Sequence, residues 1–90
     1  MLMQPSVSGR HQREHRSRRQ ETTDDIRELL GYVADQPRQI CPKHEAINLV
    51  KRRDVVELCL RARWLQHKGG SKARVQITPL GALHLASLLN

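Results

Sequence analysis

The segment that most constrains the fold runs from Trp64 to Leu85 and reads WLQHKGGSKARVQITPLGALHL. A short apolar run over 64–66 leads into a basic, glycine-containing turn over 67–72, and residues 74–77 then alternate polar and apolar side chains. Paired glycines tolerate the positive φ angles of a tight turn, and alternation is typical of a half-buried strand. The segment therefore predicts a β-hairpin with a cationic tip, followed by a helix that Thr78 caps and Pro79 opens.

A first helix is expected to begin near Thr22 or Thr23, whose hydroxyls can cap it, and to end by Gln36, ahead of Pro37. Its apolar residues recur at i, i+3, i+4 and i+7, so one face should be buried. These residues are Ile26, Leu29, Leu30 and Val33. Gly31 falls in the middle of this helix, where it would allow a neighbouring element to pack closely.

Two further helices are expected between the first helix and the hairpin. Residues 38–40 could form a short strand, and residues 42–50 form a second helix that buries Ala46, Ile47 and Val50. Asp54 and Glu57 have the spacing of a capping box, which marks the start of a third helix over about 54–63. The inward side of the third helix should carry Val55, Leu58, Cys59 and Ala62, with Val56 and Leu60 outside that stripe.

Ninety residues support one small domain, and the net charge of +7 favours polyanionic partners such as DNA, RNA or an anionic membrane surface. Residues 1–21 lack apolar periodicity, so we expect a disordered basic arm over 1–21 and a folded domain over 22–90. The chain shows no secretory signal and no membrane span, and its two cysteines suit a reduced, cytoplasmic setting.

The order of helix, short strand, helix, turn, helix, hairpin and helix resembles the winged helix-turn-helix superfamily, and most closely its small bacterial and phage regulators of the MarR, PadR and ArsR kinds. In these proteins a glycine followed by an apolar pair leads into the wing, and a Leu-Thr-x-x-Gly-x-x-x-Leu signature closes it. Thr78, Gly81 and Leu85 stand at the expected spacing, whereas Arg63, before Trp64, replaces the usual glycine. The resemblance covers about residues 23–90. It implies a mainly α fold with a small β-hairpin, made of a three-helix core, a two-stranded wing and a C-terminal helix.

The resemblance also implies a DNA-binding protein of bacterial, phage or plasmid type whose third helix enters the major groove of double-stranded DNA. Arg52 and Arg53, at the start of that helix, are the expected base contacts, because a guanidinium can pair with guanine through two hydrogen bonds. Lys51 is the expected phosphate contact. The wing should grip the backbone through His67, Lys68, Ser71, Lys72 and Arg74. Lys43 and His44, at the start of the second helix, could meet a phosphate as well.

Two other functions stay open. Glu57 and the apolar excess of the third helix also suit a protein-interaction module, such as a phage-type inhibitor or adaptor that binds a host protein. The second open function is RNA binding. The chain has only two aromatic residues, Tyr32 and Trp64, so it has few side chains on which RNA bases could stack. The last helix carries Leu80, Leu83, Leu85, Leu88 and Leu89, and it could form a homodimer with the first helix or simply pack on its own domain.

The sequence does not predict an enzyme, a cofactor or a metal site. It contains no nucleophile-elbow, phosphate-loop or zinc-protease motif. Cys41 and His44 have a ligand-like spacing, and Cys59 and His67 could complete a set of four. Structural zinc sites usually show two closely spaced pairs, and Cys59 falls on an apolar stripe, so a small hydrophobic role is favoured for it.

Overall fold

The computed structural model describes residues 18–69 and 72–90, and in this part of the chain four α-helices and one 3₁₀ turn accompany a three-stranded antiparallel sheet. In chain order the elements are α2 (Arg18–Ala34), η1 (Pro37–Gln39), β1 (Ile40–Pro42), α3 (Lys43–Val50), α4 (Arg53–Arg61), β2 (Leu65–His67), β3 (Arg74–Ile77) and α5 (Pro79–Leu89). The prediction of a mainly helical fold with a small β component is confirmed.

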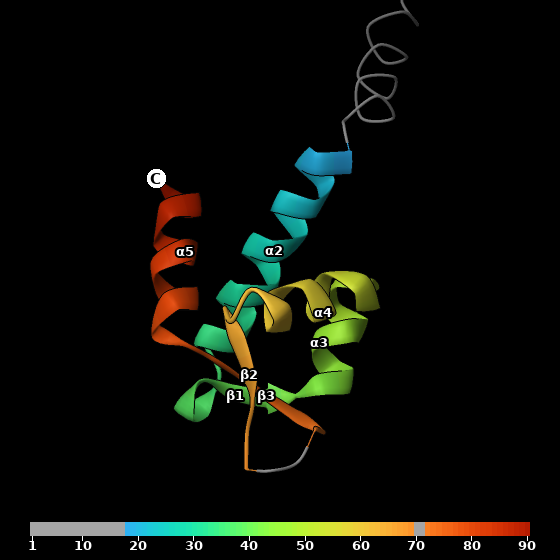
Figure 1. The fold of residues 1–90 in the computed structure, drawn as a ribbon, viewed down its shortest axis with the longest axis vertical. Helices are drawn as coiled ribbons and strands as arrows, with labels where there is room; N and C mark the ends of the chain where they lie inside the picture. Colours follow the sequence, from blue (N-terminus) through green and yellow to red (C-terminus); the bar gives the residue numbers. More distant parts are fainter. Residues whose placement is uncertain (1–17, 70–71) are drawn as a thin grey trace, which may run out of the picture.

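Helix α2 is the central element. It packs against α3, α4 and α5 and against the sheet, and Figure 1 shows α5 on one side of it with α3 and α4 on the other. The predicted apolar face is confirmed, because Ile26, Leu29, Leu30 and Val33 are all buried. Burying such a stripe is what stabilises a helix of this kind in a small domain.

The predicted start of this helix at Thr22 or Thr23 is wrong. The chain is already helical at Arg18, and the Thr23 hydroxyl donates to the carbonyl oxygen of Arg19 at 2.9 Å instead of capping a terminus. Such a bond to the preceding turn is an alternative to capping for a threonine inside a helix. Residues 18–21 of the expected arm therefore belong to α2, and the remainder of the arm, 1–17, lies outside the described residues.

The sheet has the strand order β1-β3-β2. The predicted hairpin is present as β2 and β3, with Leu65 opposite Ile77 and His67 opposite Val75. The short strand expected over 38–40 lies instead at Ile40–Pro42, where it pairs with the other side of β3 and widens the hairpin into a sheet. Arg38 and Gln39 cannot extend this strand, because both have positive φ angles and lie in η1.

Helices α3 and α4 follow the sequence-based prediction in position but not in how they begin. Pro42 is the N-cap of α3 rather than its first residue. The predicted capping box at Asp54 and Glu57 is wrong, since α4 begins at Arg53 and its N-cap, Arg52, makes no side-chain capping bond. Both carboxylates have partners other than the backbone at the start of α4. Asp54 accepts from Arg52 at 2.8 Å, and Glu57 pairs with Lys43 at 3.0 Å.

Helix α4 ends at Arg61, two residues before the expected position, and is buried over a broad face. Val55 and Cys59 are buried as predicted, whereas Leu58 is only partly buried. Val56, which lies off the predicted stripe, is fully buried. The helix packs against α2, α3 and β2, which is the reason for its apolar excess.

Helix α5 begins as predicted. The Thr78 hydroxyl accepts from the backbone N–H of Gly81 at 2.9 Å, and Pro79 occupies the first turn. The ring of His84 stacks on that of Trp64, with centroids 3.8 Å apart and planes 9° from parallel. This contact holds α5 against the segment that leads into β2.

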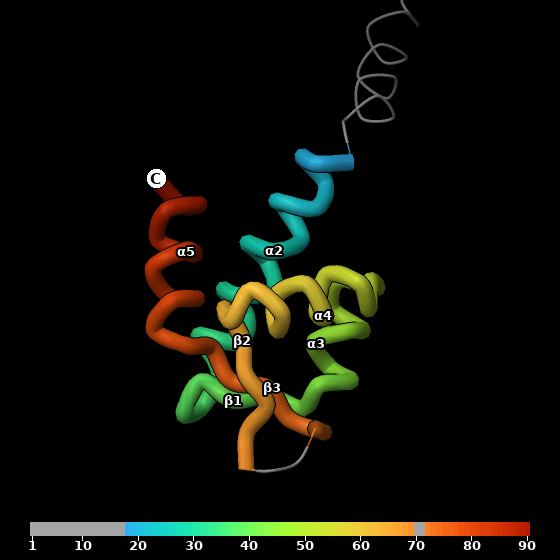
Figure 2. The backbone as a smooth tube through the Cα atoms, viewed as in Figure 1, coloured from blue at the N-terminus to red at the C-terminus, as the bar shows by residue number. Residues whose placement is uncertain are grey.

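A single cluster of apolar residues joins the helices to one face of the sheet. Its buried members are Ile26, Leu29, Leu30, Val33, Cys41, Ala46, Val50, Val55, Val56, Cys59, Leu65, Val75 and Ile77. The hairpin of β2 and β3 extends from this core toward the end of the molecule opposite the C-terminus (Figure 2). Among the described helices, none has the length and apolar character needed to cross a bilayer.

Candidate nucleic-acid interface

The basic residues singled out from the sequence lie on α3, on α4 with the turn before it, and on the hairpin. Lys43 and His44 form the first turn of α3, and the backbone N–H of Lys43 donates to the carbonyl oxygen of Ala73 at 2.6 Å. This bond places the start of α3 beside the segment that enters β3. His44, Lys68, Lys72 and Arg74 are exposed, and Ser71 lies outside the described residues.

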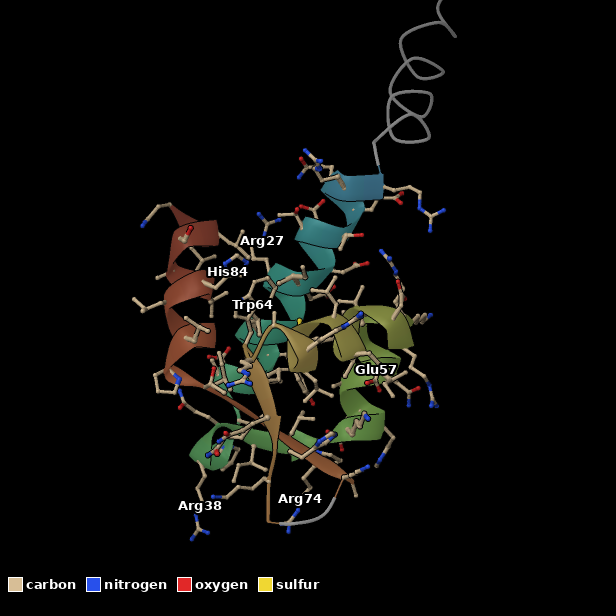
Figure 3. All side chains as sticks on the ribbon, in the orientation of Figure 1. Arg27, Arg38, Glu57, Trp64, Arg74 and His84 are labelled. Atoms are coloured by element: carbon tan, nitrogen blue, oxygen red, sulfur yellow. The ribbon has the colours of Figure 1, made fainter. Side chains whose placement is uncertain are left out.

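Glu57, on the exposed side of α4, is the point where these elements converge. Its carboxylate is 3.0 Å from the Lys43 ammonium, and the hydrogen bond from Lys43 lowers the pKa of Glu57, with the charges of Lys43, His67 and Arg53 acting in the same direction. Figure 3 shows Glu57 between α3 and α4. Its negative charge is therefore embedded among basic groups from α3, α4 and β2.

Arg52 and Arg53 are adjacent in the chain but have different surroundings. The guanidinium of Arg52 donates to Asp25 at 3.1 Å, to Thr22 at 3.2 Å and to Asp54 at 2.8 Å. These bonds, led by the one to Asp54, raise the pKa of Arg52, and they join α2 to the start of α4. Arg53 is exposed as the first residue of α4. Base contact by Arg52 stays a prediction, and the guanidinium would have to break its bonds to Asp25 and Asp54 to make it.

Lys51 occupies the turn between α3 and α4. It is the C-cap of α3 in the left-handed region, with a φ of 57°, and its backbone N–H donates to the carbonyl oxygen of Ile47 at 2.6 Å. Its side chain is exposed. The turn is thus fixed by the backbone, and the ammonium group is left at the surface beside the start of α4.

The hairpin keeps its basic groups at the surface. The backbone N–H of Lys68 donates to the carbonyl oxygen of Arg74 at 3.2 Å, and Gly69 adopts a φ of 74°, which favours glycine. A Cβ at Gly69 would lie only 3.3 Å from the Arg74 guanidinium. Arg74 and Arg38 both point away from the helices at the sheet end of the molecule (Figure 3).

A chain of side-chain amides crosses the outer face of the sheet. Gln66 of β2 donates to the Gln76 side chain of β3 at 3.0 Å, and Gln76 donates to the carbonyl oxygen of Arg38 at 3.2 Å. Cross-strand pairs of this kind stabilise neighbouring strands of a sheet. They also hold Arg38, which was not singled out from the sequence, near the hairpin.

Two further arginines, at the end of α4 and just after it, were not among the contact residues expected from the sequence. Arg61 ends α4, and Arg63 follows with a φ of 67°. The backbone N–H groups of Arg63 and Trp64 donate to the carbonyl oxygens of Leu60 and Cys59, at 3.1 and 2.9 Å, a helix ending that usually places glycine where Arg63 stands. The side chain costs about 1 to 2 kcal/mol in this conformation. The replacement of that glycine by Arg63 is visible in the sequence, but it was not linked there to a binding role.

The cysteines and histidines considered as metal ligands do not gather. Within residues 18–69 and 72–90, no group of three or more histidine, cysteine or acidic side chains is placed to hold a metal ion. Both cysteines are free and buried, and burial raises the pKa of Cys41 to about 11 and that of Cys59 to about 12. Both thiols therefore stay protonated near neutral pH and pack as small apolar groups.

Comparison of the chain with protein-family models, with curated proteins and with solved structures gives no significant match.

Proposed function

We propose that the chain is a winged-helix protein that binds double-stranded DNA and serves as a transcriptional regulator. The order of its elements supports the fold, because α2, β1, α3 and α4 are followed by a hairpin that pairs with β1 through β3. In this arrangement α4 is the helix that enters the major groove, and the hairpin is the wing.

The observation that carries the proposal is the convergence of Lys43, Arg53 and His67 around Glu57, beside a hairpin with three further basic residues. Because these groups come from α3, α4 and β2, one duplex could contact them all. Lysine and arginine on such a surface neutralise phosphates and release counterions, which supplies most of the affinity for DNA of any sequence.

Each group then has a role that follows from its position. Arg53, exposed at the start of α4, reads base edges, since recognition helices use mainly their N-terminal residues for this purpose. Lys51 and the hairpin residues hold phosphates. Arg52 orients α4 through Asp25 and Asp54. Homodimer formation through α2 and α5 and a cytoplasmic location belong to the same proposal.

Binding to a random DNA duplex across a salt series tests the proposal, with fluorescence anisotropy as the readout. We expect log Kd to rise with log salt concentration, with a slope of about 0.9 per phosphate neutralised. Replacing the hairpin residues together (Lys68→Gln, Lys72→Gln, Arg74→Gln) should weaken binding at least about tenfold and reduce that slope by about 3.

A single pair of variants provides the matched comparison. Lys72→Gln and Arg27→Gln each remove one exposed positive charge, but Arg27 lies on α2 and pairs with Asp24. Only Lys72→Gln should reduce the slope, by about 1. Unchanged affinity of the triple variant would rule out the hairpin as a DNA contact, and stronger competition by duplex RNA than by duplex DNA would assign the surface to RNA.

A further inference from the structure

An open groove of about 720 Å³ runs between α4 and β2, on the side of α4 that carries Glu57. We call it the α4–β2 groove, and define it by Glu57, Leu60, Arg61, Arg63, Leu65 and His67. Part of its wall, Glu57 and His67, belongs to the candidate nucleic-acid interface. The remainder has no role in the function proposed above.

The apolar part of the groove floor consists of two leucines, and the polar Gln66 and Thr78 line the groove as well. Leu65, the first residue of β2, is buried, and Leu60 of α4 is partly buried and packs against the core. A sugar-phosphate backbone has little to gain from such a floor. An apolar side chain seated there would be removed from water on several sides, which is favourable in proportion to the area covered.

The rim of the groove is cationic. Arg61 and Arg63 are exposed, and within the described ranges 18–69 and 72–90 neither forms an ion pair. The carboxylate of Glu57, on the same groove, is engaged by Lys43. Two free guanidinium groups above an apolar floor are complementary to a ligand that carries both carboxylates and an apolar group.

Arg63 adds an independent observation. Its backbone is held in the left-handed region by the hydrogen bonds that end α4, and the Thr78 hydroxyl donates to its carbonyl oxygen at 2.6 Å. Glycine would adopt this conformation without strain. A strained arginine that lines a groove points to a use for its side chain that offsets the loss of stability.

We propose that the α4–β2 groove binds an extended acidic segment of a partner protein, with an apolar side chain of that segment on Leu60 and Leu65. Carboxylates on the segment pair with Arg61 and Arg63. Strand β2 is an edge of the sheet, so some of its backbone N–H and C=O groups face away from β3 and can pair with an extended chain. Because the groove shares Glu57 and His67 with the candidate nucleic-acid interface, such a partner competes with DNA.

The test uses the full chain and a fluorescein-labelled peptide of alternating aspartate and leucine, with anisotropy as the readout. A peptide of alternating aspartate and serine has the same charge without the apolar side chains. We expect the leucine peptide to bind at least about tenfold more tightly, as the loss of several buried methylene groups implies. Arg63→Gly should weaken its binding at least about fivefold while raising the thermal unfolding temperature.

Two further variants and a DNA arm make the outcome decisive. Arg61→Gln should weaken peptide binding without altering the backbone, and Arg27→Gln, the charge-matched control on α2, should leave it within about twofold. Equal binding of the two peptides, or equal binding by the native chain and both groove variants, overturns the proposal. The proposal is also overturned if the groove variants weaken binding of duplex DNA but not of the peptide, because the groove would then belong to the DNA-binding surface. If the chain binds the peptide but does not bind DNA, the acidic-segment proposal holds and the proposed DNA-binding function does not.

Discussion

At the scale of single residues, two glycines in helices have opposite surroundings. Gly81 lies in the first turn of α5, where a Cβ would overlap the carbonyl oxygen of Trp64 and lie 2.9 Å from the Ile77 side chain. Gly31, in the middle of α2, has no neighbour within 4 Å of the same position. The expectation that Gly31 admits a closely packed neighbour is therefore wrong, and Gly81 has that role.

This contrast predicts opposite effects of the same substitution. Gly81→Ala should lower the free energy of unfolding by about 2 kcal/mol or more, because backbone atoms must move to admit the methyl group. Gly31→Ala should raise it by about 0.5 to 1 kcal/mol, since alanine is the better helix former and nothing obstructs it. Urea unfolding followed by circular dichroism measures both, and a neutral Gly81→Ala would show that α5 does not pack on Trp64 as described.

At the scale of elements, the sequence predicts a helix or strand well where contacts between residues close in the chain determine it. Strand β3, the Thr78 cap and the buried face of α2 follow from alternation, capping and a period of 3.6 residues, and all are confirmed. The position of β1 was missed because pairing with β3, more than 30 residues away in the sequence, decides it.

The candidate site was predictable in its residue types but not in its pairing. The D-x-x-E spacing of Asp54 and Glu57 favours a capping box, yet Arg52 and Lys43 provide stronger partners for the two carboxylates. The sequence alone cannot reveal that Arg52 reaches Asp25, because the two residues meet only when α2 packs beside α4. The same packing leaves Arg53, rather than Arg52, free at the surface.

The link between α2 and α4 predicts a measurable coupling between Arg52 and Asp25. Their side chains are 27% and 25% exposed, and a double-mutant cycle with Arg52→Gln and Asp25→Asn should give about 1 kcal/mol. The pair of Arg27 and Asp24, which lies within one helix and has the Arg27 side chain 45% exposed, is the control and should give less than about 0.5 kcal/mol. Coupling of equal size in the two cycles would contradict a special role for Arg52.

The same substitution should alter the response to acid. The hydrogen bond from Arg52 lowers the pKa of Asp54 below its ordinary value of 3.8. This carboxylate therefore contributes stability that is fully present above about pH 4 and is lost as the pH falls through the lower folded-state value. In Arg52→Gln that part of the acid dependence should disappear, so the stability curves of the two proteins should converge as the pH falls below the folded-state pKa of Asp54.

At the scale of the whole molecule, the basic groups and the exposed leucines lie on different elements. The basic residues of the candidate nucleic-acid interface belong to α3, the turn before α4, the start of α4 and the hairpin, whereas Leu80, Leu83 and Leu89 are 51%, 70% and 66% exposed on α5. Figure 1 shows α5 alongside α2, on the opposite side from α3 and α4. A second copy could therefore cover α5 without blocking the candidate nucleic-acid interface.

The composition of α5 makes this arrangement testable. The helix contains no Asp, Glu, Lys or Arg, and its Leu85 and Leu88 pack on the core of their own chain, whereas Leu80, Leu83 and Leu89 face solvent. If a second copy covers them, light scattering should give twice the 10.4 kDa mass of one chain. Leu83→Glu should then give the mass of a single chain, because a carboxylate cannot be buried there without a partner.

Asn48→Glu is the control for Leu83→Glu. It adds the same charge at an exposed position on α3 and should leave the mass unchanged. Since a dimer with two DNA-reading helices contacts two half-sites, Leu83→Glu should also weaken binding to a long duplex while leaving the folded structure intact by circular dichroism. A native chain that scatters as a single copy up to about 100 μM, a concentration at which a Kd of about 1 μM would give mostly dimer, would exclude α5 as a self-association surface.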